Sequence, residues 1–562
     1  MAFTEISYAP LSNTWIKVKA LFKAELINIL AAFLLLLLAV FLLYPIFAVL
    51  IKSIKGPEGF TLSYYNNFVT EGYYYRSLFN TLLLGSINTI ICLTAGFCLA
   101  YLTTRGPRRL RKPLKILSML PLVAPPYLFA LSLIILFGRN GILTKMLDLN
   151  WSIFGFDGVV ISQTIAFIPL AFLMIENTFM SLDPNLEESA YDMGASESTV
   201  IRTVTIPLLA PGLLKTAMLV FAMTIAEFGN AAILGGRTPF LAPDTYTVIT
   251  GEGNLQMGSV LSIILIIPCI LIFFLHNYAL KGKKFTTIGG KPVASEPREI
   301  SPLIKTLFLI IAGSVALIIL TSFVVVTVAS AVEIIGIKNT FTLRHILDFD
   351  SNIAIYNSVK VSLIAALVGS LIGILLSYVI ARGKFFGRAF IEMIALSGFA
   401  LPGTVIGIGY IFAFGAPPLK LTGGIMILAL SSVFRFLAVG VEAGISKLHQ
   451  LNIEIEEASQ DLGAASLTTF YNIVLPIIFP AFAAGFIYIF MTSMVSLSTV
   501  VFLITPGFDL AATRIFDAAI YGRIGLASAT TIKMILIVIL CLVLLSFLSK
   551  KTRLDISQKG VG

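Results

Sequence analysis

Two short acidic segments of this 562-residue chain follow one pattern, and their residue types suit contact with another protein surface rather than catalysis. Glu-Ser-Ala-Tyr-Asp-Met-Gly runs from Glu188 to Gly194, and Glu-Ala-Ser-Gln-Asp-Leu-Gly runs from Glu457 to Gly463, at an offset of 269 residues. Acidic residues favour the first turn of a helix, and small residues let another surface approach closely. Each segment therefore predicts a short capped helix that a partner can contact.

The flanking residues extend the match between the two segments. Nine residues follow each glycine, and then Val-Thr-Ile-Pro ends at Pro207 and Ile-Val-Leu-Pro ends at Pro476. The glycines suit the end or a bend of the short helix, and the prolines suit the start of the next helix. A single copy could be a capped connector between two helices, but two copies in register favour docking sites for two copies of a soluble partner. The carboxylates concerned are Asp183, Glu187, Glu188 and Asp192, then Glu454, Glu456, Glu457 and Asp461.

Polar residues within apolar stretches form a second group of candidates. Glu227 and Asn230 interrupt one such stretch, and the same offset of 269 places Ser496 opposite Glu227. Ser498 and Thr499 follow Ser496, and Arg435 is a second charge in an apolar stretch. Because charges are costly in hydrocarbon, these groups are expected to face protein or water, and they are candidates for a translocation path. Alternatively, Glu227 pairs with helix-terminal amides or a basic neighbour, and Arg435 is either that partner or an independent anchor.

The composition places these residues in a membrane. The chain is 57% hydrophobic and 12% charged, with a mean hydropathy of +0.96, which excludes an ordinary soluble fold. A spanning helix needs about 20 largely apolar residues, since its backbone must be hydrogen-bonded internally. About twelve stretches qualify, at 28–51, 78–103, 114–137, 158–182, 207–234, 259–279, 303–329, 356–381, 390–414, 422–446, 476–503 and 527–549.

The distribution of basic residues predicts the orientation. Of 39 Lys and Arg, 25 lie in the terminal segments and alternate loops on one side of the predicted helices, and 11 lie on the other side. The positive-inside rule places the first side, with both termini, in the cytoplasm. The net charge of +10 and the basic cluster at 105–115 are therefore read as topology signals and not as a nucleic-acid site. The scattered Cys and His residues give no metal-ligand spacing.

A second repeat divides the chain into two halves. Arg105-Gly106 corresponds to Arg382-Gly383, and Asn80 corresponds to Asn357, at an offset of 277. Six spans in each half give parallel repeats related by an axis along the membrane normal. We therefore expect an all-α integral membrane protein of two pseudo-symmetric six-helix halves, at 1–280 and 306–562. A cytoplasmic linker would occupy 281–305, and the docking loops would lie near 183–207 and 452–476.

The repeated loop resembles the signature loop of bacterial ABC importer permeases, which reads Glu-Ala-Ala, three residues, Gly, nine residues, Ile-x-Leu-Pro. Ser189 and Ser459 replace one alanine in each copy. The resemblance implies a type I importer permease fold in the inner membrane, with each loop forming a coupling helix that sits in a groove of an ATPase subunit. It also implies a periplasmic or lipid-anchored binding protein that selects the cargo. The residues implied to carry ATP-driven motion are Glu188, Ala190 and Gly194, with Glu457, Ala458 and Gly463.

The chain itself has no phosphate-binding loop, because Gly289-Gly290-Lys291 is followed by Pro292 and lacks the earlier glycine. We expect no cofactor on this chain and no enzymatic activity of its own, with ATP and Mg²⁺ bound by two copies of a separate subunit. The fused halves and the segment at 511–516 most resemble ferric-iron importer permeases, and similar permeases carry thiamine, polyamines, sulfate or 2-aminoethylphosphonate.

An ion-coupled secondary transporter is the alternative of a different class, since it also uses twelve spans in two halves. It would need a coupling-ion site within the membrane. Glu227 and Arg435 alone give little support for such a site. A channel is disfavoured because the sequence has no evident selectivity-filter repeat.

Overall fold

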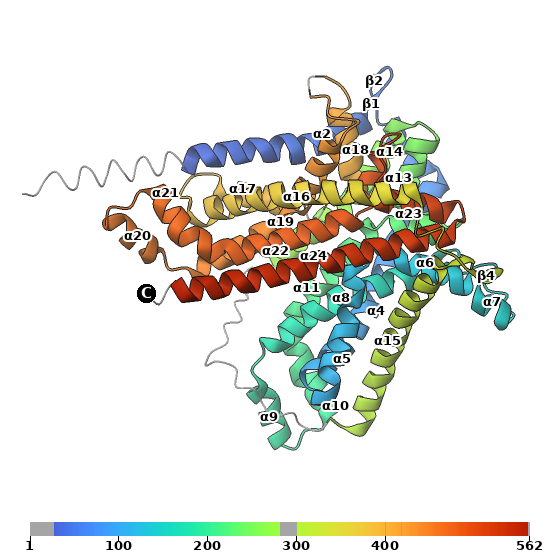
Figure 1. Ribbon diagram of the computed structural model, residues 1–562, viewed down its shortest axis with the longest axis horizontal. Helices are drawn as coiled ribbons and strands as arrows, with labels where there is room; N and C mark the ends of the chain where they lie inside the picture. The colour runs from blue at the N-terminus through green and yellow to red at the C-terminus, as the bar shows by residue number, and fades with distance from the viewer. Residues whose placement is uncertain (1–26, 281–299, 399–400, 418, 560–562) are drawn as a thin grey trace, which may run out of the picture.

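The computed structural model describes residues 27–280, 300–398, 401–417 and 419–559, and this part of the chain is almost entirely helical (Figure 1). Eleven of its helices are long and apolar enough to cross a membrane, which confirms the predicted fold class. Most of the predicted linker, 281–299, lies outside the described residues. Seven spans are the helix Ile27–Ile54 with α2 (Tyr44–Ile54), α4 (Gly72–Thr104), α8 (Phe156–Met180), α14 (Leu255–Leu280), α15 (Pro302–Ser330), α16 (Phe349–Arg382) and α19 (Ile425–Gln450). An eighth is α24 (Ile524–Lys559).

The third span of each half is interrupted, whereas the sequence predicted continuous helices at 114–137 and 390–414. In the first half α5 (Arg108–Met119) and α6 (Tyr127–Phe137) are separated by a 3₁₀ turn at Leu120–Val123 and then Pro125 and Pro126. In the second half α17 (Arg388–Ser397) ends before Pro402, and α18 (Gly403–Phe414) follows it. Proline lacks an N–H group and disfavours the helical conformation of the preceding residue, which accounts for both interruptions.

The fifth span of each half begins earlier than predicted. In the first half α10 (Glu197–Val200) continues through a π-helical turn at Ile201–Thr205 into α11 (Ile206–Ala226). In the second half the order is α21 (Ser466–Thr469), a π-helical turn at Phe470–Val474 and α22 (Leu475–Val495). Pro207 and Pro476 therefore do not begin the spans but lie where the π turn returns to α-helix. A π turn relaxes the regular hydrogen-bond ladder, so a residue without an N–H group is tolerated there.

The first span of each half packs on the opposite half. Helix α2 contacts α18 of the second half as well as α14 of its own half. Helix α15, the first span of the second half, contacts α6 and α4 of the first half as well as α24. The boundary predicted at 281–305 thus divides the sequence repeat, but the two halves are not separately packed bodies.

The repeated asparagines have matching structural roles at the end of the molecule opposite the docking loops. Asn80 Nδ2 donates to the carbonyl of Pro239 and Asn357 Nδ2 to that of Asp509, each at 3.1 Å. The next residues, Thr81 and Ser358, accept from the first backbone N–H groups of α13 (Leu241–Tyr246) and α23 (Ala511–Ile520). The second span of each half therefore holds the short helix that precedes the sixth span.

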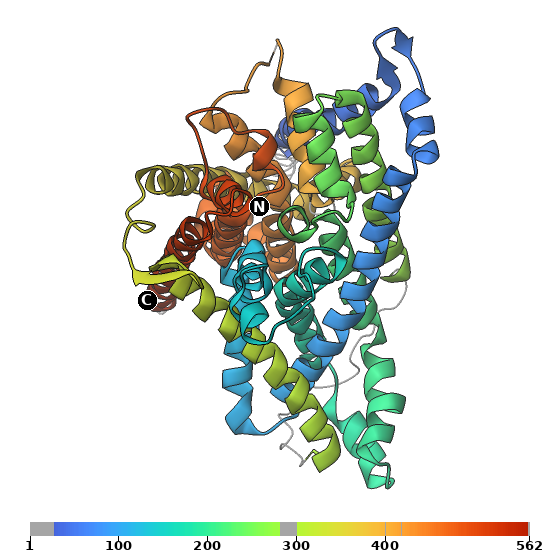
Figure 2. The same ribbon diagram turned by 90° about the vertical axis from the view of Figure 1, so that its right-hand side faces the viewer.

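The two halves meet at one end and separate at the other. Figure 1 shows α13 and α23 close to one another, whereas α9 (Pro184–Asp192) and α20 (Ile453–Asp461) lie far apart at the tips of the two halves. Figure 2 shows the tip of the first half, which carries α9, at the lower right. The remaining short helices are α3 (Ser63–Thr70), α7 (Ile142–Met146) and α12 (Gly229–Leu234), with π-helical turns at Ala39–Leu43 and Thr247–Gly251 and a 3₁₀ turn at Val500–Phe502. Two antiparallel hairpins pair β1 (Lys55–Gly56) with β2 (Gly59–Phe60) and β3 (Val332–Ile334) with β4 (Lys338–Phe341).

Close backbone contact between α19 and α22 gives a testable stability prediction. A Cβ atom at Gly485 would lie 3.0 Å from Gly440 Cα, and small residues are what allow membrane helices to approach this closely. We expect Gly485→Val to cost about 1–3 kcal/mol through overpacking and to lower the melting temperature of the purified protein. Gly313→Val is the control, since nothing lies within 4 Å of a Cβ atom there. Equal melting temperatures for the two variants would contradict this packing.

Candidate functional site

The two docking loops form the predicted short helices. Asp183 caps α9, since its side chain accepts from the Asn185 backbone N–H at 3.0 Å, and Pro184 occupies the first turn. Gly194 and Gly463 follow the two helices with φ of +85° and +94°, a conformation that favours glycine. A Cβ atom at either glycine would meet nothing within 4 Å, so the glycines are required by backbone conformation and not by crowding.

One predicted contact residue in each loop is buried against the helices of its own half. Glu187 is buried, and its carboxylate accepts from Arg105 Nε at 2.7 Å and from Thr205 Oγ1 at 2.7 Å. Glu456 is only 2% exposed and accepts from Arg382 Nε at 2.7 Å. The arginines end the second span of each half, so the two sequence repeats meet in one equivalent ion pair per half. Glu187 and Glu456 therefore anchor the docking helices and are not available for contact with a partner.

The remaining predicted contact residues divide between exposed and buried positions. Ala190 is buried, which removes it from the predicted contact surface, whereas Ala458, which corresponds to Ser189 of the first copy, is exposed. Glu188, Glu457 and both glycines are exposed.

The sequence interpretation missed the most exposed apolar side chains of both loops. Met193 and Leu462 immediately precede the two glycines and are 83% and 90% exposed. They occupy equivalent positions in the two repeats, and exposed apolar groups of this kind mark interaction surfaces. The sequence feature that could have identified them is an apolar residue at the same position of both acidic segments.

Glu227 lies where the fifth span of the first half ends. Its carboxylate accepts from the backbone N–H groups of Gly229 at 2.7 Å and Asn230 at 3.0 Å, and from Gln163 Nε2 of α8 at 3.0 Å. The neighbouring Asn230 side-chain amide is buried and makes no hydrogen bond within the described residues. The sequence left two kinds of partner open for Glu227, helix-terminal amides or a basic neighbour, and the structure shows the amides.

Arg435 is anchored separately, at the equivalent break of the second half. Its Nη1 lies within hydrogen-bond distance of Ser496 Oγ at 2.9 Å, Ser498 Oγ at 3.1 Å and Thr499 Oγ1 at 2.7 Å, and its two N–H groups are shared among these three acceptors. All four residues were predicted as path candidates, and the structure brings them together. Gly403, which the sequence interpretation missed, begins α18 beside this cluster, and a Cβ atom there would overlap Ser498 Oγ and Arg435 Nη1. Only glycine leaves room for the arginine.

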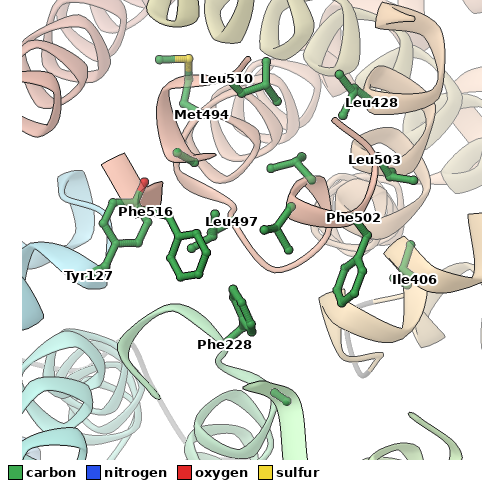
Figure 3. Close-up of a cluster of buried hydrophobic side chains, with 14 of the residues drawn as sticks. Tyr127, Phe228, Ile406, Leu428, Met494, Leu497, Phe502, Leu503, Leu510 and Phe516 are labelled. Carbon is green, nitrogen blue, oxygen red and sulfur yellow. The ribbon is translucent and has the colours of Figure 1, made fainter. Parts of the chain in front are cut away.

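Apolar side chains from both halves close the space next to these two breaks. The rings of Phe228 and Phe516 lie 5.4 Å apart, and those of Tyr246 and Phe502 lie 5.5 Å apart. Figure 3 shows Phe228 facing Leu497 and Phe516, with Tyr127 beside them. All of these side chains except that of Tyr246 are buried, so apolar contacts between the two halves fill the space next to the breaks in the observed conformation.

Two equivalent halves, each with a membrane bundle and an anchored docking helix, define a fused two-domain permease of an ABC importer. The chain belongs to the family of binding-protein-dependent transport system inner membrane components, which matches residues 92–285 and again 369–553. It is accordingly a multi-pass inner-membrane protein of that family.

Similar proteins include ferric transport permeases. The chain is 29% identical over 538 residues to the ferric transport system permease protein FbpB of Actinobacillus pleuropneumoniae, covering 93% of this chain and 78% of that protein. It is 29% identical over 495 residues to the putative ferric transport system permease protein FbpB 1 of Haemophilus influenzae, covering 86% and 78%. The molybdenum transport system permease protein ModB of Azotobacter vinelandii is 32% identical over 162 residues, covering 28% and 72%.

Among solved structures, a bacterial ABC transporter that imports the acidic polysaccharide alginate aligns with a TM-score of 0.40 and 16% sequence identity. The alignment covers 48% of this chain and 99% of that chain.

The anchoring pair predicts a local effect on α20. Removing one partner of a buried ion pair costs about 3–5 kcal/mol, because the other charge is left uncompensated. We expect Glu456→Ala to increase amide hydrogen exchange across residues 453–469 in the purified protein. Glu457→Ala, which removes an exposed carboxylate from the same helix, is the matched control. Unchanged exchange in Glu456→Ala would show that the Arg382 contact does not hold this helix.

Proposed function

We propose that this chain imports ferric iron by ATP-driven alternating access, with ATP hydrolysed by two copies of a separate subunit that bind α9 and α20. The observation that carries the proposal is the pair of equivalent exposed apolar side chains, Met193 and Leu462, at the tips of anchored helices. Each is large enough to fill an apolar groove and is flanked by exposed carboxylates. In this proposal both termini are cytoplasmic, and a binding protein delivers the cargo from the opposite side.

The anchoring contacts supply a physical route for the coupling. Glu187 joins α9 both to Arg105 at the end of α4 and to Thr205 in the π turn that leads into α11. Force applied to α9 therefore reaches the second and fifth spans together. Because the two halves already meet at the opposite end, drawing α9 and α20 together would rock the halves about that contact and change the layer around Phe228 and Leu497.

Ferric iron is favoured as cargo by the similarity to ferric transport permeases over almost the whole chain. Glu227 adds no separate support, because its carboxylate oxygens already accept hydrogen bonds from Gly229, Asn230 and Gln163. An anionic cargo of the 2-aminoethylphosphonate type is the second candidate, favoured by Arg435 with its three hydroxyl partners. Thiamine and polyamines are suggested only by the sequence resemblance, and no contact among the described residues favours them.

If Met193 and Leu462 bind the ATPase subunit, making both side chains polar should release that subunit from the complex. We expect Met193→Asp combined with Leu462→Asp to abolish copurification of the cognate ATPase, because a charge would be buried in an apolar groove. Phe386→Asp, which changes a fully exposed apolar residue of the loop between α16 and α17, is the control and should leave copurification unchanged. Replacing Gly194 and Gly463 with bulky residues should also weaken association. Normal copurification in the Met193/Leu462 double variant would overturn the assignment.

Transport in proteoliposomes tests the cargo and the energy source. With the binding protein and ATPase present, we expect uptake of radioactive ferric iron that requires ATP and is not reduced by excess 2-aminoethylphosphonate. Competition by the phosphonate would favour the anionic cargo. Uptake by the purified chain alone, driven only by an ion gradient, would instead identify a secondary transporter.

A further inference from the structure

A large cavity opens on the side of the molecule opposite the docking helices, between the two halves. Its volume is about 1110 Å³, and loops of both halves line it. The first half contributes residues next to α6 and after α12, and the second half contributes residues around β3 and β4 and at the start of α24. Figure 1 shows α7 and β4 at this end, far from α9 and α20. None of the residues discussed above as path candidates lines this cavity.

Four arginines line the cavity, and each comes from a different loop. Arg139 and Arg237 belong to the first half, and Arg344 and Arg523 belong to the second. All four are exposed, and none makes a side-chain hydrogen bond or ion pair with the described residues. They account for four of the 11 basic residues that the sequence places on the external side. Arg344 interacts electrostatically with Glu333, and Arg523 does so with Asp517 and lies over the ring of Tyr521. The wall still carries more positive than negative charge, with four arginines against two carboxylates, and such a surface attracts anions.

The carboxylates in the cavity wall are already engaged by other cations. Glu333 pairs with Lys338 at 2.7 Å and also accepts from Thr340 Oγ1 at 2.9 Å. Asp348 caps α16 by accepting from the Ser351 backbone N–H at 2.9 Å, and it lies 3.7 Å from Arg514. Neither Lys338 nor Arg514 lines the cavity. Within the described residues, the wall therefore presents four guanidinium groups without a side-chain hydrogen bond or close ion pair, and two carboxylates that also interact with cations outside the wall.

We propose that this cavity binds a small multivalent oxyanion of the phosphate or polycarboxylate class. Guanidinium groups present paired N–H donors that match the oxygens of such anions, and converging arginines from both halves can bind several oxygens at once. The volume exceeds that of one phosphate and accommodates a metal ion bound to its anion. If the proposed ferric cargo is correct, iron would then enter this cavity as an anionic complex, because a bare trivalent cation would be repelled.

Direct binding measurements on the purified full-length chain in lipid nanodiscs test the site without an ATPase or binding protein. Citrate and inorganic phosphate, without added metal, are the calorimetric probes. We expect saturable citrate binding at low ionic strength that weakens as salt is raised. R237Q combined with R523Q should weaken it roughly tenfold or more, since each half loses one guanidinium contact. R76Q is the matched control, because Arg76 is also external and exposed but does not line the cavity.

The result that overturns the proposal is absence of saturable binding of both probes, or equal binding by wild type and the R237Q/R523Q variant. If that variant loses its size-exclusion profile, R139Q combined with R344Q makes the same comparison. Loss of binding-protein association in the double variant, with no citrate or phosphate binding to the wild type, would assign the arginines to protein docking and also overturn the proposal. Failure of ferric transport would leave these binding results unaffected, so the two proposals can fail separately.

Discussion

An arginine–glutamate ion pair at the membrane boundary connects each docking helix to the rest of the molecule. Arg105 with Glu187 and Arg382 with Glu456 occupy equivalent positions, and in both pairs the arginine Nε lies 2.7 Å from the carboxylate. A pair of this kind is a rigid connection, because separating the charges in a partly dehydrated setting is costly. The nearby membrane helices and the docking helix must therefore move together, which is the mechanical requirement for any transport cycle powered from the cytoplasm.

The backbone keeps its two-fold resemblance deep in the membrane, but the charges there do not. Both fifth spans end at matching residues, Glu227 and Ser496. In the first half a carboxylate accepts backbone N–H groups, whereas in the second half Arg435 occupies the corresponding region by donating to hydroxyl groups. The two halves therefore differ in charge at positions where their backbones correspond, with a carboxylate in the first half and a guanidinium group in the second. Two identical subunits could not carry this difference.

Much of this architecture could be predicted because short stretches of the sequence determine it. Apolar stretches located the membrane helices, and the repeated acidic segments located α9 and α20 with their left-handed glycines. What could not be predicted depends on tertiary placement: the inward direction of Glu187 and Glu456, the close approach of Gly403 to Arg435, and the convergence of four distant arginines on one cavity. The fifth spans were predicted to begin at Pro207 and Pro476, and this was wrong. Proline is tolerated next to a π turn as well as in the first turn of a helix, so its position alone does not locate a helix start.

The exchange of first spans has a consequence for how such a permease can be built. Since α2 is buried partly against α18 and α15 partly against α6, each half completes its partner's lateral wall. A half on its own would lack the first span of the other half on one flank, and its own first span would keep only its contacts within that half, chiefly with α14 or α24. Fusion into one polypeptide supplies the two halves in equal number. It also keeps each first span close to its contact surface on the other half during membrane insertion.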